Sequence, residues 1–112
     1  MDMMNGKGGA IMRKFTDKRL EKLDEAISIY SCMRKIDDEV VIKMSKDLFI
    51  ELIAVNHPFV TYSRDLFHPH QYKGKYLELV PAFDYVAVAY FNTRTGKEHH
   101  LKEIKEGENN AI

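Results

Sequence analysis

Residues 75–91 read Lys-Tyr-Leu-Glu-Leu-Val-Pro-Ala-Phe-Asp-Tyr-Val-Ala-Val-Ala-Tyr-Phe, and they decide the class of fold. In Lys75–Val80, leucines alternate with other residues, as they do in a β-strand. Tyr85–Phe91 is apolar on both faces, which is typical of a central strand. The turn-forming Pro81–Asp84 link predicts that the two strands pair with each other in antiparallel fashion.

The segment from Asp17 to Arg34 is predicted to form a long amphipathic helix. Apolar side chains recur along it at three- and four-residue steps, namely Leu20, Leu23, Ala26, Ile27, Ile29, Tyr30 and Met33. Thr16 is the expected N-cap, and Asp17 suits the positive end of the helix dipole. Because this stripe is wide for a small protein, we expect the helix to pack on a sheet, with a dimer seam as an alternative use of the surplus.

Two shorter elements are expected next. Glu39–Met44 has the composition of a short β-strand. Ser45 is then the expected N-cap of a second helix, Lys46–Val55, which Asn56 and Pro58 would end. A strand remains the alternative for this segment, because alternate positions are apolar at Leu48, Ile50, Leu52 and Ala54.

The C-terminal part completes the expected fold. After a turn at 92–96, Lys97–Lys105 either returns as an edge strand or forms a last helical turn, and Gly107–Ile112 is expected to be a frayed tail. We therefore predict a single α+β domain over residues 12–106. In it, one long amphipathic helix and a shorter helix pack on a small, mainly antiparallel sheet.

The N-terminal residues suggest a start codon inside the printed sequence. Lys7-Gly8-Gly9 can be encoded by the purine run with which bacterial ribosomes pair, and only Ala10 and Ile11 separate it from Met12. We expect Met12 to be the true start and residues 1–11 to be a flexible leader that is not native. A flexible glycine-rich N-terminus is the alternative.

Composition predicts a soluble protein of a reducing cytoplasm, and the ribosome-binding pattern before Met12 predicts that this cytoplasm is bacterial. Seventeen basic and seventeen acidic side chains cancel, so no overall field draws the chain to nucleic acid or to an anionic membrane. Cys32 is the only cysteine, which suits a reducing compartment. No apolar run is long enough to cross a bilayer, and no secretory signal is visible.

Catalysis, metals and cofactors are not expected. Cys32 falls within the predicted helix, and none of the serines stands in a nucleophile-elbow motif. The acidic residues 37–39 suit a solvated turn between a helix and a strand. The pairs His68/His70 and His99/His100 lack the spacing that folds ligands onto one ion. We therefore expect a protein that is not an enzyme and has no resident metal or cofactor.

The segment Asn56–Tyr76 is the expected contact surface. It is too long for a simple connector, so we expect a partly structured arm or a functional loop, with a short strand at Phe59–Tyr62. Nine of the twelve aromatic residues lie between Phe59 and Phe91, more than a small sheet hides. Aromatic side chains and arginine anchor many protein interfaces. The predicted partner contacts are Phe59, Tyr62, Arg64, Phe67, Tyr72 and Tyr76.

The same segment supports a second hypothesis. Arg64, Lys73 and Lys75 stand among its aromatic residues, and cations beside exposed rings bind single-stranded nucleic acid. A small nucleic-acid-binding protein is therefore the alternative to a protein-binding one. A homodimer would use the same apolar surface.

The order of elements supplies a resemblance. A helix, a strand, a helix and an aromatic loop precede Lys73–Val80 and a short apolar strand, and this order resembles small accessory proteins of bacteriophages and prophages. The resemblance implies a non-enzymatic accessory or regulatory protein that binds a host or phage protein. It leaves a virion or assembly component as a third hypothesis, and it carries no functional residue across.

Overall fold

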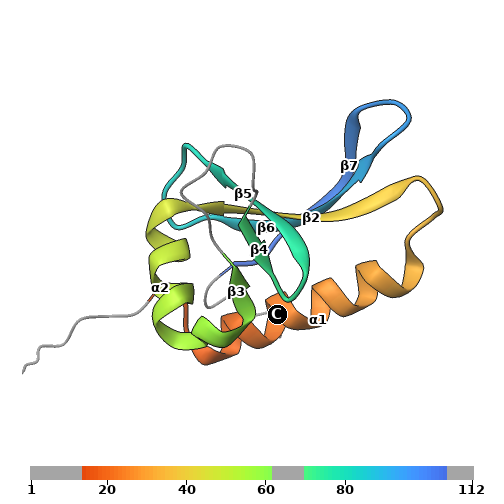
Figure 1. The fold of residues 1–112 in the computed structure, drawn as a ribbon. Coiled ribbons are helices and arrows are strands. Elements are labelled where there is room, and N and C mark those ends of the chain that lie inside the picture. The colour runs from red at the N-terminus through yellow and green to blue at the C-terminus, as the bar shows by residue number, and fades with distance from the viewer. Residues whose placement is uncertain (1–13, 62–69, 106–112) are drawn as a thin grey trace, which may run out of the picture.

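The computed structural model describes residues 14–61 and 70–105, and within them it has the predicted α+β class (Figure 1). The expected leader at 1–11 and the expected tail at 107–112 lie outside these residues. The elements are α1 (Asp17–Met33), β2 (Asp38–Ser45), α2 (Lys46–Asn56), the 3₁₀ helix η1 (His57–Phe59), β3 (Val60–Thr61), β4 (His70–Tyr72), β5 (Lys75–Val80), β6 (Val86–Asn92) and β7 (Lys97–Glu103).

The first helix begins as predicted and buries less than predicted. The Thr16 hydroxyl accepts a hydrogen bond from the Arg19 amide at 3.2 Å, so Thr16 is the N-cap. Leu23, Ala26 and Ile27 are buried, together with Arg19. Toward the C-terminus the stripe is wider than the sheet covers, because Ile29 is 48% exposed and Met33 is 73% exposed. Tyr30, which lies between them in the chain, still packs on Tyr90 of β6, with ring centroids 4.7 Å apart.

Residues 46–55 form a helix, as predicted, and the strand alternative is wrong. Leu48, Phe49 and Leu52 face the core, and the helix ends at Asn56. Ser45 occupies the N-cap position, but its hydroxyl does not cap α2. It accepts a hydrogen bond from the Tyr85 amide at 3.0 Å and lies 3.2 Å from the Tyr85 carbonyl oxygen. The predicted capping bond is therefore wrong, because a neighbouring strand end uses the hydroxyl.

The sheet corrects the predicted pairing of its two most apolar strands. Its order is β3-β4-β5-β2-β6-β7, so β2 lies between β5 and β6. Val41 of β2 is aligned with Tyr76 of β5 on one side and with Ala89 of β6 on the other. The β2–β5 pairing is parallel, and the other four are antiparallel. The predicted direct pair of 75–80 with 85–91 is wrong, because the 81–85 link passes the end of β2.

The described residues of the segment 56–76 form mostly regular structure. The segment contains η1, β3, β4 and the start of β5, while residues 62–69 lie outside the described part. The predicted strand at 59–62 corresponds to β3, which is Val60–Thr61. Lys73 and Gly74 both have positive φ, 51° and 78°, which suits the two-residue turn joining β4 to β5.

The helices lie on the same side of the sheet, and the β6–β7 turn projects away from them (Figure 1). The core between helices and sheet includes Leu23, Ile42, Leu48, Leu52 and Val88, all fully buried. Of the two alternatives for 97–105, an edge strand or a helical turn, the structure has the edge strand β7. Among the described strands it pairs with β6 alone. No helix in residues 14–61 and 70–105 is long and apolar enough to cross a membrane.

Candidate functional site

On the face of the sheet that carries the helices, α1 leaves the region beside the edge strand β7 incompletely covered. It packs on β6 and β2, and it touches the edge strand β7 far less. Two cavities of about 330 and 230 Å³ lie between α1 and β7, and Ile29 lines both of them. We call the two cavities together the α1–β7 groove. Its lining consists of Lys22, Glu25, Ala26, Ile29, Tyr30, Met33, Lys35, Asp38, Tyr90, His99, His100, Lys102, Glu103, Ile104 and Lys105.

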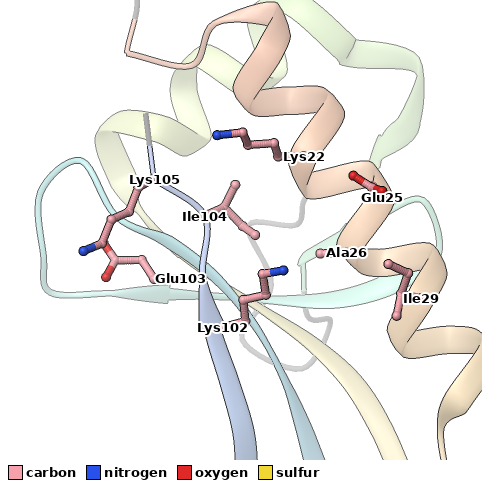
Figure 2. Close-up of a pocket in the computed structure, with 8 residues that line it drawn as sticks. All are labelled: Lys22, Glu25, Ala26, Ile29, Lys102, Glu103, Ile104 and Lys105. Atoms are coloured by element: carbon pink, nitrogen blue, oxygen red, sulfur yellow. The ribbon is translucent and has the colours of Figure 1, made fainter. Parts of the chain in front are cut away.

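The smaller cavity has an apolar floor and a charged rim. Figure 2 shows Ile104 and Lys102 pointing toward α1, whereas Glu103 and Lys105 point away from it. Alternate residues of a strand face opposite sides of a sheet, so this division is expected. Ala26 and Ile104, both nearly fully buried, form the apolar floor together with Ile29. The rim carries Lys22 and Glu25 from the helix and Lys102 from the strand.

The larger cavity is lined by a cluster of four rings. The Tyr30 and Tyr90 centroids are 4.7 Å apart, and the His99 centroid lies 5.5 Å from that of Tyr90. His100 stands edge-on to Tyr90 at 6.2 Å and lies 4.8 Å from His99. Centroid separations in this range allow favourable ring contacts. Met33 adds an exposed thioether beside the rings.

Hydrogen bonds from the two tyrosines connect α1 to β6 and to the edge strand β7. The Tyr90 hydroxyl donates to the Tyr30 carbonyl at 2.7 Å, and the Tyr30 hydroxyl donates to the His100 carbonyl. Burial raises the pKa of each hydroxyl above its ordinary value, so both remain protonated donors near neutral pH. Two hydrogen bonds therefore connect α1 to the strands that line the larger cavity.

A buried carboxylate orients one of the histidines. Asp38 is 3% exposed, and its Oδ1 lies 3.0 Å from Nε2 of His99 and accepts a bond from the Asn92 amide at 3.0 Å. The hydrogen bond from His99 is the main cause that lowers the pKa of Asp38, and Asn92 adds to it, while burial opposes them. The Asp38 carboxylate therefore already has two hydrogen-bond partners, His99 and Asn92, within the wall of the cavity.

The edge strand carries a bulge at the groove. The β6–β7 register shifts between Val88 and Tyr90, which are aligned with Lys102 and His99. Two residues of β7 therefore stand opposite Ala89, and one of them, His100, has a φ of 58°. A left-handed conformation costs a residue other than glycine about 1–3 kcal/mol and is often found at functional sites. The bulge directs the His100 carbonyl to Tyr30.

The lining combines several kinds of chemistry. The paired His99 and Asp38 resemble the base and its orienting carboxylate in hydrolytic enzymes, and lysine, tyrosine and glutamate side chains also line the groove. Within the described ranges, no three potential metal ligands come together. What the groove offers is an apolar floor, polarisable rings and a charged rim.

The six predicted contact residues do not form one surface where they are described. Phe59 is 51% exposed, with the Lys73 ammonium 5.1 Å from its ring. Tyr72 is fully buried, and its hydroxyl donates to Asp24 at 2.8 Å, so it is a core residue rather than an exposed contact. Tyr76, 48% exposed, follows Tyr72 across the β4–β5 turn. The other three, Tyr62, Arg64 and Phe67, lie outside the described residues.

Tyr72 and Tyr76 face opposite sides of the sheet. Tyr72 is aligned with Lys75, and Tyr76 with Gln71. Aligned residues share a face and successive residues alternate, so the two tyrosines cannot belong to one contact surface. Sequence reasoning missed the groove, although it noted the histidine pair at 99 and 100 and the surplus width of the helical stripe. That surplus, Ile29 and Met33, is the signal that marks the groove.

Comparisons with known proteins add no assignment: no protein-family model, curated protein or solved structure matches this chain.

Proposed function

We propose that this protein is a non-enzymatic binding module that holds a segment of another protein in the α1–β7 groove. The observation that carries the proposal is the line of exposed apolar side chains at the groove. Ile29 is 48% exposed and Met33 is 73% exposed, and both line the larger cavity, whose other walls are aromatic rings. Covering such surface with a partner releases water and stabilises the complex.

The types of side chain favour a protein partner. Tyrosine is enriched at the centres of interfaces, and the unbranched methionine side chain adapts to a partner's shape. The larger cavity, at about 330 Å³, is near the lower limit of roughly 300–1,000 Å³ for pockets that enclose small ligands. Because the two cavities share Ile29 and both lie along α1, together they suit an elongated occupant better than a compact one.

The segment 59–76 supports the nucleic-acid alternative less well. Its Lys73 pairs with Asp24 of α1 at 3.0 Å, and its Tyr72 is buried. The Tyr72 ring is therefore not available for stacking, and the Lys73 charge already has a partner. An accessory or regulatory role in a phage or prophage remains part of the proposal and rests on the sequence alone.

The test is capture from a lysate of the source organism by the tagged full chain, with nuclease added. We expect one protein to be retained by the wild type and lost with Met33→Asp, because a carboxylate would be buried against the apolar groove. Ile50→Asp is the matched control, since Ile50 is an exposed helical residue on α2, outside the groove. Equal retention by Met33→Asp and the wild type, or loss of all bound material on nuclease treatment, would overturn the proposal.

A further inference from the structure

Resting on the proposed function, we infer that His99 selects the partner's anchoring side chain in the larger cavity by accepting a hydrogen bond at Nδ1. The side chain that fits is a ring with its own O–H or N–H donor, as tyrosine and tryptophan have. The inference rests on the lining of the cavity, the fixed orientation of His99 and the open second nitrogen of its ring.

The lining of the larger cavity suits a ring. Ile29 and Met33 leave apolar surface exposed along α1. The rings of Tyr30, Tyr90 and His99 stand beside that surface, with centroids 4.7 and 5.5 Å apart along the series. An inserted aromatic side chain makes favourable contacts with such rings and with the methionine sulfur. It also removes apolar surface from water, which favours binding.

The Asp38 carboxylate determines which nitrogen of His99 carries a proton. Its Oδ1 lies 3.0 Å from Nε2 of His99. The hydrogen bond from His99 is the main cause that lowers the pKa of Asp38, so this carboxyl is ionised near neutral pH and can only accept. Nε2 is therefore the donor. In the neutral imidazole, Nδ1 then carries no proton and is a hydrogen-bond acceptor.

This second nitrogen, Nδ1 of His99, is open to an occupant. It has no hydrogen-bond partner among the described residues. It is also not one of their buried polar atoms without a partner, which are Ser31 Oγ and His70 Nδ1, so it reaches solvent. An occupant that covers Nδ1 without a donor removes its water and leaves the acceptor unpaired, which disfavours binding. A ring with an O–H or N–H replaces the lost bond.

The other polar groups of the cavity wall offer no equally fixed and open acceptor. The Lys35 ammonium has donors only. The two tyrosine hydroxyls already donate to backbone carbonyls. Asp38 is 3% exposed. His100 is exposed, and no hydrogen bond to another described residue fixes its ring. His99 is thus the group that distinguishes a donating ring from a plain one.

The experiment compares matched probes by NMR titration of the isotope-labelled full chain, in mildly alkaline buffer in which imidazoles are mostly neutral. The probes are the N-acetyl amides of tryptophan and benzothienylalanine, and those of tyrosine and phenylalanine. Within each pair the rings have nearly the same shape, and only the first member donates. We expect that first member to bind about five- to tenfold more tightly.

The imidazole nitrogen spectrum provides a direct readout of the acceptor. It should show the proton of His99 on Nε2, and the Nδ1 signal should move with the tryptophan amide but not with the benzothienylalanine amide. Met33→Asp should weaken all four probes, whereas Ile50→Asp, outside the groove, should leave their affinities unchanged. Because the probes of a pair are compared on the same wild-type chain, a folding defect cannot imitate the preference.

The outcomes separate this inference from the proposed function. Equal affinities within both pairs, or a proton on Nδ1 of His99, would overturn the inference and leave the groove as the partner's binding site. Absence of binding by all four probes, or full affinity for Met33→Asp, would overturn it as well. The proposed function fails by a different result, which is equal retention of the partner from the lysate by the wild type and Met33→Asp.

Discussion

Tyr90 and Tyr30 are joined twice: their rings lie 4.7 Å apart, and the Tyr90 hydroxyl donates to the Tyr30 carbonyl at 2.7 Å. Tyr30 belongs to the last turn of α1, where carbonyls have no partner within the helix. A side chain of β6 therefore supplies the missing donor. This contact fixes the C-terminal half of α1 above the sheet and at the same time forms a wall of the groove.

Removing the Tyr90 hydroxyl should cost about 1 kcal/mol of unfolding free energy, because the Tyr30 carbonyl loses its donor while the ring contact stays. The measurement is urea unfolding of Tyr90→Phe. Tyr76→Phe is the control, since that tyrosine is half-exposed on the opposite side of the sheet, and we expect no measurable change. Equal effects of the two substitutions would show that the hydrogen bond contributes nothing.

Arg19 is expected to be among the most sensitive positions in the chain. Its side chain is 2% exposed, and it donates to the carbonyls of Ile104 at 2.9 Å and Lys14 at 3.1 Å and to the Asp84 carboxylate at 2.7 Å. Arg19→Met should lower the unfolding free energy by about 2–4 kcal/mol, because buried carbonyls lose their donor.

The control for Arg19 is Asp84→Asn, also measured by urea unfolding. Asp84 has a φ of 56°, which asparagine tolerates, and the amide oxygen still accepts from the guanidinium. We expect a loss under about 1 kcal/mol, because the Asp84 side chain is 44% exposed and water screens its charge. If Arg19→Met cost no more than Asp84→Asn, the buried hydrogen bonds would not be the source of stability.

The lowered pKa of the Asp38 carboxylate predicts that the folded protein loses stability in acid. This pKa is lowered in the folded protein, so the folded state binds fewer protons than the unfolded state, whose aspartates titrate near about 3.9. The stabilisation is present above that value and disappears as the pH falls through the folded pKa. Unfolding free energies of the wild type and of Asp38→Asn should therefore converge as the pH falls below the unfolded value. A difference that stays constant in acid would contradict the assignment.

The left-handed residue in β7 gives a prediction about backbone strain. His100→Gly relieves the positive φ, while the added freedom of the unfolded chain offsets that gain, so stability should change by less than about 0.5 kcal/mol. His100→Val should cost at least about 1 kcal/mol more, because a β-branched side chain strains this conformation. Thermal or urea unfolding of the two variants decides the point, and equal stability would mean that the bulge relaxes.

Local patterns in the sequence predicted the elements well. The cap at Thr16, the helical period of α1 and the turn residues near Asn56 and Pro58 all act through near neighbours. The order of the strands was not predictable in this way. Neighbouring strands lie about 4.8 Å apart, so a five-residue link is long enough both for a direct β5–β6 hairpin and for a crossing past β2. Almost every residue of β2 is buried, as in a central strand. This burial favours the observed order, in which one strand pairs with each edge of β2.

The groove was harder to predict because it depends on contacts between distant residues. Tyr30 meets His100, and Asp38 meets His99, across separations of 70 and 61 residues. The aromatic richness of 59–76 drew attention to that segment instead, yet Tyr72 is needed to fill the core against α1. Composition identified residues suited to binding, and only the packing of α1 determined which apolar side chains remained exposed.

The most direct test of the groove is amide NMR of the isotope-labelled full chain, titrated with the protein partner that it captures. The account predicts that the largest shift changes fall on two segments, Ala26–Met33 of α1 and His99–Ile104 at β7. Changes confined to residues 57–61 and 70–76, with these two segments unmoved, would contradict it and return the binding site to the aromatic segment.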